Sequence, residues 1–258
     1  MIRKATLYDK KPVLEFCKNT FSWGDYIQDV WDYWLSEGVF LVAEKLIPVG
    51  ICHAVFFKEQ VWIEGIRVNP DFRRKGIASK LVRKIESISK EKQIKLSFML
   101  IDTENQPSLE MAKILNYKIF QTWNFYSLTP KPNINHHISF GNTSSKNQID
   151  HYVKSWRWVP LDEENLNFLN SNNCIIFSGN DDNKTIAILE DSEHFKNTLI
   201  VSLYAGAENN TKNVVSFLQN YGFEKHYQRL QILTKEFFPD FKGLDFRISF
   251  HLMQKLLS

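Results

Sequence analysis

The sequence has few cysteines, little net charge and no long apolar run, and each shortage excludes a class of protein. Cys17, Cys52 and Cys174 are far apart, show no CxxC spacing and have apolar neighbours, which predicts buried free thiols in a reducing compartment. A formal net charge of only +3 gives no strong field for nucleic acid or a membrane surface. The start, MIRKATLYDKKP, is too polar for a signal peptide, and no apolar run approaches the roughly 20 residues of a membrane helix. We expect a cytoplasmic protein.

Hydrophobic residues make up 43% of the 258 residues, which is enough for one large core or two modest ones. Residues 39–43, 50–57 and 61–68 are short segments rich in β-branched and aromatic residues, separated by polar or Pro/Gly turns. They predict consecutive antiparallel strands. Residues 96–101, LSFMLI, form an unbroken apolar run that is typical of a central strand covered on both faces.

Residues 69–82, NPDFRRKGIASKLV, place three consecutive cations before a lone glycine. Apolar residues then recur at helical spacing from Ala78 to Ile88, so the pattern predicts a strand, a basic turn and a helix. A second helix is expected to open near Pro107 and to end at Asn116, a residue that tolerates the left-handed conformation. A further strand is expected after it, over residues 117–126.

The basic turn has the features of an anion site. A helix N-terminus carries unpaired backbone N–H groups and a partial positive charge, and Gly76 leaves room for a ligand to approach the main chain. Arg73, Arg74 and Lys75 add charge that can neutralise a pyrophosphate. The alternative is a solvated loop in which the glycine only relieves a tight turn. Neither GxxxxGK[ST] nor GxGxxG occurs, so the two common phosphate loops are excluded.

These residues resemble the acetyl-coenzyme A-binding motif of the GNAT superfamily of N-acetyltransferases, V-x-P-x-[aromatic]-[RQ]-x-x-G-x-[GA]. The matching residues, in order, are Val68, Pro70, Phe72, Arg73, Gly76 and Ala78. Asn105 and Ser108, with Leu115-Asn116-Tyr117 further on, are similar to the second motif of the family. The resemblance covers residues 1 to about 127 and implies an α/β GNAT fold, a mixed and mostly antiparallel sheet flanked by helices.

The resemblance implies an N-acetyltransferase that moves acetyl from acetyl-CoA, without a metal, to the amine of a small metabolite, with a free amino acid as one candidate. Coenzyme A would lie where the strand carrying Val68 diverges from the next, with its pyrophosphate on the amides of residues 74–79. The residues expected to bind it are Val68, Arg73, Arg74, Lys75, Gly76, Ile77, Ala78, Ser79, Asn105 and Ser108.

Glu64, which precedes the basic turn on the same strand, is the expected general base, acting directly or through water. Its other interpretation is an edge carboxylate paired with a lysine. The family often protonates the departing thiolate with a tyrosine seven residues after the asparagine, but Ala112 occupies that position here. Tyr117, Ser108 or water could supply the proton. Alternatively, the chain is a non-catalytic coenzyme A-binding module whose C-terminal half mediates interactions.

Residues 21–34 gather aromatic side chains and three aspartates. In the family the equivalent segment covers the acceptor end of the cleft, and such rings and carboxylates would suit a small cationic amine. We therefore predict that Asp25 and Tyr26 contact the substrate. The competing interpretation is a helix whose aromatic face packs in the core and whose aspartates are solvated.

A shift to Pro, Asn, Ser and Gly marks a linker at residues 129–147, between a GNAT-like domain at 1–128 and a C-terminal domain at 148–258. His136 and His137 in this linker lack further ligands at suitable spacing and are interpreted as solvated. Residues 197–222 repeat the strand, Asn turn and helix of residues 96–117 without a basic turn. We therefore expect a degenerate GNAT-like second domain that binds no cofactor.

Overall fold

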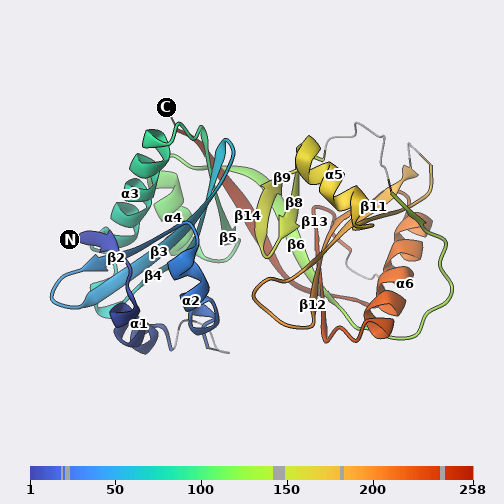
Figure 1. Cartoon of the computed structure of the whole chain (residues 1–258), viewed down its shortest axis with the longest axis horizontal. Helices are drawn as coiled ribbons and strands as arrows, with labels where there is room; N and C mark the ends of the chain where they lie inside the picture. The colour runs from blue at the N-terminus through green and yellow to red at the C-terminus, as the bar shows by residue number, and fades with distance from the viewer. Residues whose placement is uncertain (19, 21–23, 142–148, 181–182, 239–241, 258) are drawn as a thin grey trace. The chain divides into compact units, whose positions relative to one another are not determined.

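The computed structural model describes residues 1–18, 20, 24–141, 149–180, 183–238 and 242–257. The chain divides into two compact units: unit 1 comprises Met1–Phe120 and His251–Ser258, and unit 2 comprises Gln121–Phe250 (Figure 1). In chain order the elements are β1 (Ile2–Lys4), η1 (Leu7–Asp9), α1 (Lys10–Cys17), α2 (Ile27–Ser36), β2 (Val39–Glu44), β3 (Pro48–Phe57), β4 (Gln60–Val68), η2 (Pro70–Phe72), α3 (Ile77–Glu91), β5 (Leu96–Asp102), α4 (Gln106–Ile114), β6 (Lys118–Leu128), β7 (Ser139–Phe140), β8 (His151–Lys154), β9 (Arg157–Pro160), α5 (Glu163–Ser171), β10 (Ile175–Ser178), β11 (Thr185–Asp191), β12 (Thr198–Tyr204), α6 (Glu208–Glu224), β13 (Arg229–Thr234) and β14 (Leu244–Leu256).

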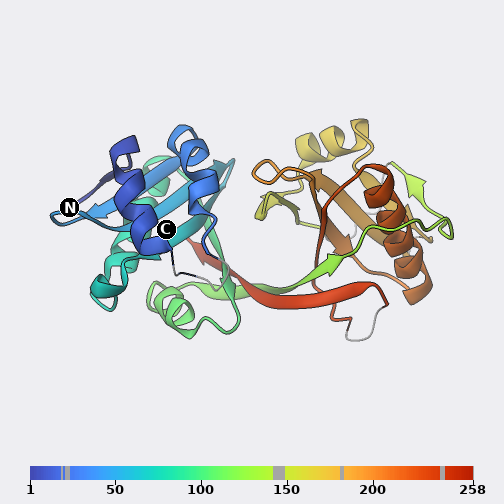
Figure 2. The same cartoon turned by 90° about the horizontal axis from the view of Figure 1, so that it is seen from below.

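Unit 1 has three layers. Strands β1 to β5 are neighbours in sequence order, antiparallel from β1 to β4 and parallel between β4 and β5. Alternation along β2 distributes its side chains over both faces: Phe40 and Val42 pack with α1 and α2, whereas Leu41 and Ala43 pack with α3. Figures 1 and 2 show α1 and α2 on one side of the strands and α3 and α4 on the other. The expected strands and helices of this region are confirmed.

Strand β4 is interrupted where it reaches the site. His53 of β3 pairs with Glu64, but Ile51 pairs with Arg67, so β4 carries one extra residue and bulges. Gly65 supplies the positive φ of 62° that this bulge needs. Pairing of β4 with β5 ends at Ile63 and Met99, although both strands continue. The two strands therefore open beyond this point.

Unit 1 includes the last residues of the chain. Met253 and Leu257 are buried in the core formed with α3, and the Leu257 N–H donates to the Lys95 carbonyl at 2.7 Å. Lys255 forms an ion pair with Glu86 of α3 at 2.8 Å. Residues 251–258, which the composition placed with the second half, thus stabilise unit 1.

Unit 2 repeats the topology of unit 1. Strands β10, β11 and β12 are antiparallel, and α6 connects β12 to the parallel strand β13, as α3 connects β4 to β5. The structural counterpart of residues 198–234 is therefore the segment from β4 to β5, whereas the sequence pattern pointed to residues 96–117. Two strands of similar length and a helix between them occur in both places, so spacing alone did not distinguish them.

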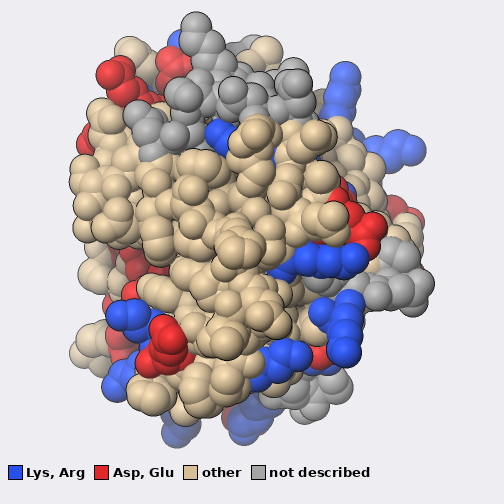
Figure 3. All heavy atoms as spheres, turned by 90° about the vertical axis from the view of Figure 1, so that its right-hand side faces the viewer, with Lys and Arg blue, Asp and Glu red and all other residues tan. Residues whose placement is uncertain are grey.

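The expected linker at 129–147 lies within unit 2, where β7 pairs with β10 and residues 142–147 fall outside the described residues. Cys17 and Cys52 are buried free thiols as expected, and burial raises the pKa of Cys17 to about 12, but Cys174 is partly exposed. On the face seen in Figure 3, several of the described cations lie beside anions, and a broad area of other residues separates those at the lower left from those at the right. Within the described residues, no helix is long and apolar enough to cross a bilayer.

Candidate functional site

The turn between β4 and α3 is built by its own backbone and side chains. Asn69 caps the short helix η2, its Oδ1 accepting a hydrogen bond from the Asp71 N–H at 3.1 Å. Arg74 and Gly76 then adopt positive φ angles of 61° and 72°, which turns the chain into α3. The sequence pattern of strand, basic turn and helix is confirmed.

The start of α3 is open. A Cβ built on Gly76 would meet no atom within 4 Å, and no side chain caps this end of the helix. The first helical N–H groups lack intrahelical partners by geometry, and the helix dipole makes this end attractive to anions. Gly76, Ile77, Ala78 and Ser79 therefore form a backbone cradle that fits a phosphate group.

Three exposed cations, Arg73, Arg74 and Lys75, directly precede this cradle in the chain. The Arg73 Nε donates to the Val68 carbonyl at 3.2 Å, and the Lys75 Nζ donates to the Asp71 carbonyl at 2.9 Å. Arg74 meets Glu110 at 3.3 Å, an exposed pair worth little in water. Each charge is thus held near the turn by contacts that a multivalent anion can replace at small cost.

The second motif forms the start of α4. Asn105 is its N-cap, and its Oδ1 accepts a hydrogen bond from the Ser108 N–H at 3.2 Å. Ala112 is fully buried in the core of unit 1, so the position where the family often has a tyrosine offers no polar group. Asn116 ends the helix at a positive φ of 66°, as its residue type predicted.

Tyr117 lies away from the opening between β4 and β5. Its hydroxyl is 2.6 Å from the Ser97 Oγ, and burial raises the pKa of the phenol far above its ordinary value. Ser97 pairs with Val61, where the two strands are still joined. The structure therefore does not bring Tyr117 together with Glu64.

Glu64 stands at the bulge with its side chain only 15% exposed. Its Oε1 is 2.8 Å from the Nδ1 of His53, and its Oε2 accepts a hydrogen bond from the Trp62 Nε1 at 3.1 Å. A basic partner of this carboxylate is thus a histidine on the neighbouring strand, whereas the alternative interpretation paired it with a lysine. The carboxylate is held in one orientation beside the strand opening.

His53 is a site residue that no sequence pattern indicated. The histidine is fully buried on β3, and its ring stacks on Trp34 with centroids 4.5 Å apart and planes 7° from parallel. The available signal was a single titratable residue in the otherwise apolar run GICHAVFF. Its partner could not be identified without the register of the hairpin, which pairs it with Glu64.

Asp25 and Tyr26 meet Arg67, the residue that follows the bulge. Both oxygens of Asp25 bind the Arg67 guanidinium, at 2.7 and 3.2 Å, and both side chains are largely buried. The guanidinium carbon lies 5.3 Å from the centroid of the Tyr26 ring. Burial raises the pKa of the Tyr26 phenol. Asp25 therefore reaches the expected end of the site as one half of an ion pair.

The rest of the aromatic segment divides between core and solvent. Trp31 and Trp34 are buried against Phe40, whereas Asp29 and Asp32 are exposed. For these residues the competing interpretation, a helix with an aromatic core face and solvated aspartates, is confirmed. Trp34 fills the space beneath Gly65, where a Cβ would come within 2.3 Å of the indole ring. Residues 21–23 of the predicted acceptor wall lie outside the described residues.

A surface cavity of about 400 Å³ lies in unit 2, lined by residues that include Ser127, Arg229 and Arg247. It belongs neither to a strand opening nor to a helix N-terminus, so we assign it no role in binding an acyl carrier. No group of three potential metal ligands from His, Cys, Asp and Glu occurs among the residues that the structure describes.

Comparison with known proteins shows a family match over part of the chain and a similar fold in solved structures. Residues 11–117 match the family model described as Acetyltransferase (GNAT) family. No curated protein matches the chain in sequence. Among solved structures, a GCN5-related N-acetyltransferase from Sphaerobacter thermophilus has a TM-score of 0.65 at 11% identity, covering 100% of this chain and 95% of the other.

Two archaeal structures are similar over the same length. A candidate acetyltransferase from Thermoplasma acidophilum has a TM-score of 0.62 at 13% identity, with 98% of this chain and 91% of the other covered. One from Pyrococcus horikoshii has a TM-score of 0.59 at 15% identity, with 100% and 89% covered. At these identities the likeness shows the fold alone, and it extends through both units.

Proposed function

Because the chain carries a domain of the GNAT acetyltransferase family over residues 11–117, on a GNAT fold with a mixed, mostly antiparallel sheet flanked by helices, we propose that it transfers acetyl from acetyl-CoA to a small cationic amine. Amino acids are the first candidates for the acceptor. The second unit is proposed to be a degenerate copy of the same fold that binds no coenzyme A of its own.

The observation that carries this proposal is the open strand pair beside an open helix start. Beyond Ile63, β4 and β5 no longer pair, so their backbone groups can bind the amides of a pantetheine arm. The cradle at Gly76 follows directly on β4 and fits a pyrophosphate, with Asn105 and Ser108 at the start of the next helix. A peptide-like arm and a pyrophosphate are the two features of coenzyme A that such a site can recognise.

The thioester supplies an activated acetyl group. The amine nitrogen attacks its carbonyl carbon, the C–N bond forms, the C–S bond breaks, and the thiolate leaves with the electron pair. We assign to Glu64 the proton that the amine must lose, because its carboxylate lies at the bulge beside the opening. A backbone N–H near Val68 would stabilise the negative charge on the carbonyl oxygen.

We leave Tyr117 out of proton transfer because its hydroxyl is engaged with Ser97 in the core. A thiolate is a tolerable leaving group near neutral pH, since its ordinary pKa is about 8.5, so water or Ser108 can complete this step. The replacement of the family's tyrosine by Ala112 should therefore slow the reaction without abolishing it.

The acceptor end favours a cation at Glu64. Arg67 already neutralises Asp25, so Glu64 is the carboxylate we expect to attract an ammonium group, while the Tyr26 ring adds an aromatic face. Asp25 would act by holding Arg67 in place. Asp25→Asn and Tyr26→Phe should then raise the KM for the best amine, and an unchanged KM in both variants would leave this segment as scaffold.

Release of free thiol from acetyl-CoA, measured across a panel of amino acids and other amines, tests the activity. We expect at least one amine to accelerate release, and Glu64→Gln to lower the rate most at low pH, where free amine is scarce. The second candidate function, a coenzyme A-binding module without turnover, is favoured by Ala112. Calorimetric binding of coenzyme A without thiol release for any amine would support that alternative.

A further inference from the structure

His53 has two hydrogen-bonding neighbours that both accept. Its Nε2 is 2.9 Å from the carbonyl oxygen of Glu37, and its Nδ1 is 2.8 Å from the Oε1 of Glu64. A backbone carbonyl has no proton to give, so Nε2 must carry one. A neutral imidazole would then present the lone pair of Nδ1 to a carboxylate, which is repulsive. The geometry requires one further proton between Nδ1 and Oε1.

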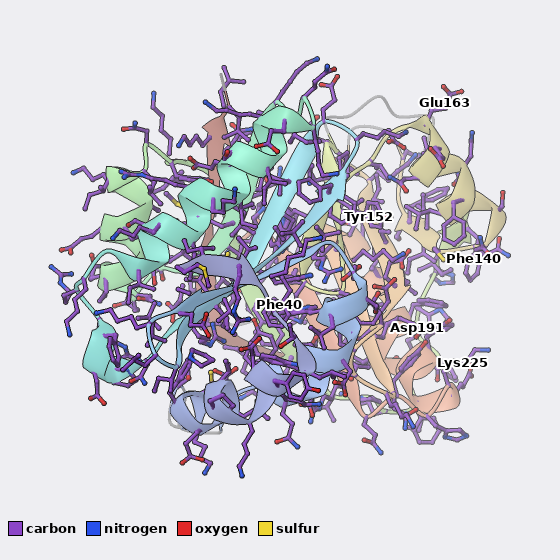
Figure 4. The ribbon with its side chains drawn as sticks, turned by 60° about the vertical axis from the view of Figure 1, so that its left-hand side comes forward. Phe40, Phe140, Tyr152, Glu163, Asp191 and Lys225 are labelled. Atoms are coloured by element: carbon purple, nitrogen blue, oxygen red, sulfur yellow. The ribbon has the colours of Figure 1, made fainter. Side chains whose placement is uncertain are left out.

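The position of this proton depends on which group is better stabilised when charged. Glu64 accepts a second hydrogen bond, from the Trp62 Nε1, which favours the ionised carboxylate. The His53 ring lies flat against Trp34, whose π face attracts a cation. The ring of Phe40, which is labelled in Figure 4, meets the His53 ring edge-on, with the two centroids 5.8 Å apart. Full burial opposes a charge on His53, but this charge would be paired and hydrogen-bonded at both nitrogens.

We infer that His53 is an imidazolium that keeps Glu64 ionised and fixed in orientation at the strand opening, and is thus a positioning residue for acetyl transfer. This inference rests on the proposed function for its consequence, but the shared proton itself does not. A cation behind the carboxylate resists a second proton, so Glu64 stays available to an ammonium substrate in mildly acidic solution.

Other charged and titratable groups surround the pair. Arg67 and Asp25 neutralise each other, and their ion pair reaches the site from β4 and from the start of α2. The Tyr26 phenol and the Cys52 thiol both interact electrostatically with Glu64, and burial raises the pKa of each, so both remain neutral. His53 is thus the titratable group whose hydrogen bond reaches the Glu64 carboxylate directly.

The first test is independent of activity. In protein labelled with ¹⁵N-histidine, the signals of His53 are assigned by their loss in His53→Asn. At about pH 7.5 both ring nitrogens of His53 should be protonated, because each faces an acceptor. Glu64→Gln should abolish this pattern. A neutral His53 ring in the parent protein would overturn the inference.

The second test is the pH dependence of kcat/KM for the best amine. In His53→Asn the side-chain amide can still donate to Glu64, but it carries no charge. We expect the acid limb of this variant to move up by about one pH unit, the usual effect of losing a nearby opposite charge, whereas in Glu64→Gln the limb should follow the fraction of free amine alone. Thermal unfolding establishes that each variant is folded. A uniform loss of rate with an unmoved limb would reduce His53 to a structural role and overturn the inference.

The two tests also separate the inference from the proposed function. If no amine is acetylated, the proposed function fails, and the ¹⁵N spectrum still decides whether the pair holds its proton. If acetylation occurs and the spectrum shows a neutral ring, the function stands and the positioning role of His53 is wrong.

Discussion

The segments β4–α3–β5 and β12–α6–β13 have the same topology but differ in how far their parallel strands stay paired. In unit 1, parallel pairing covers four positions, from Gln60 to Ile63, and then the strands open. In unit 2 it covers six, from Thr198 to Leu203, which is nearly all of β12. The difference begins with the bulge at Gly65, because an extra residue redirects the backbone of β4. Strand β12 pairs with β11 and β13 without a register shift.

The two helix starts differ as well. Among the described residues, a Cβ on Gly76 would meet no heavy atom within 4 Å, whereas one on Gly206 would lie 2.3 Å from the Asn183 carbonyl oxygen. The Gly206 N–H donates to the Thr185 Oγ1 at 2.8 Å, and Glu208 places a negative charge in the first turn of α6. An anion that fits the first helix start would meet protein atoms and a like charge at the second.

A common topology therefore does not by itself make an acyl-carrier site. The site requires an unfilled helix N-terminus and a strand that stops pairing early, and the two local features occur together in unit 1. Where both are absent, as in β12–α6–β13, we expect no coenzyme A to bind. This contrast can be tested by changing each feature separately.

The largest effect is expected from deleting residues 251–258. These residues place β14 beside β5 and bury Leu252, Met253 and Leu257, each side chain worth about 1.5–3 kcal/mol. Their sum is comparable to the whole stability of a domain. We expect unit 1 to lose amide protection in hydrogen exchange and to lose coenzyme A binding, while residues 121–250 keep most of their protection.

A milder pair of variants controls for the loss of chain length. Leu252→Ala should destabilise unit 1 by about 2–5 kcal/mol, because the side chain is fully buried. Leu256→Ala, at a side chain that is 70% exposed on the same strand, should change stability by less than about 0.5 kcal/mol. Equal effects of the two variants would show that the contribution of β14 does not lie in its buried face.

The next effect is on binding. Gly76→Val fills the cradle and strains a backbone with φ of 72°, so we expect coenzyme A affinity to fall by at least about tenfold, or 1.4 kcal/mol. Calorimetry on the parent protein should give one coenzyme A per chain. An unchanged affinity in the variant would remove the cradle from the site, and a stoichiometry of two would show that the start of α6 is not closed.

The converse variant lies in unit 2. Gly206→Ala places a methyl group against the backbone at Asn183, and this contact cannot be relieved by rotating a side chain. We expect a loss of about 1–3 kcal/mol in the unfolding of unit 2, followed by denaturant titration, with coenzyme A affinity unchanged. Weaker coenzyme A binding together with unchanged stability would mean that Gly206 belongs to a ligand site.

The sequence predicted most of the local structure around the site in unit 1 and little of the structure of unit 2. Local signals were sufficient for the strands, for the basic turn and for the left-handed stop at Asn116. The His53–Glu64 pair depends on hairpin register, which composition does not specify. The assignment of residues 251–258 to unit 1 depends on tertiary packing far along the chain. The counterpart of α6 was misaligned because strand, turn and helix recur at similar lengths.

The smallest effect concerns a carboxylate of unit 2. Burial, reinforced by Glu193 and Asp191, raises the pKa of Glu190 to about 7, although Lys154 acts in the opposite direction. The folded state therefore binds a proton that the unfolded chain releases near pH 4.5, so the free energy of unfolding decreases as pH rises from about 4.5 to 7. Glu190→Gln removes this loss.

The variant should accordingly resemble the parent protein near pH 4 and exceed it by on the order of 1–2 kcal/mol at pH 8, a value reduced from the full shift because the side chain is partly exposed. Denaturant titrations at the two pH values measure this difference. Glu163→Gln is the matched control, because it removes the same charge from the exposed first turn of α5, well apart from Asp191 in Figure 4. Its effect should be a few tenths of a kcal/mol and nearly independent of pH between these values. Equal gains from both substitutions at pH 8 would indicate that net charge, and not burial of Glu190, limits the stability of unit 2.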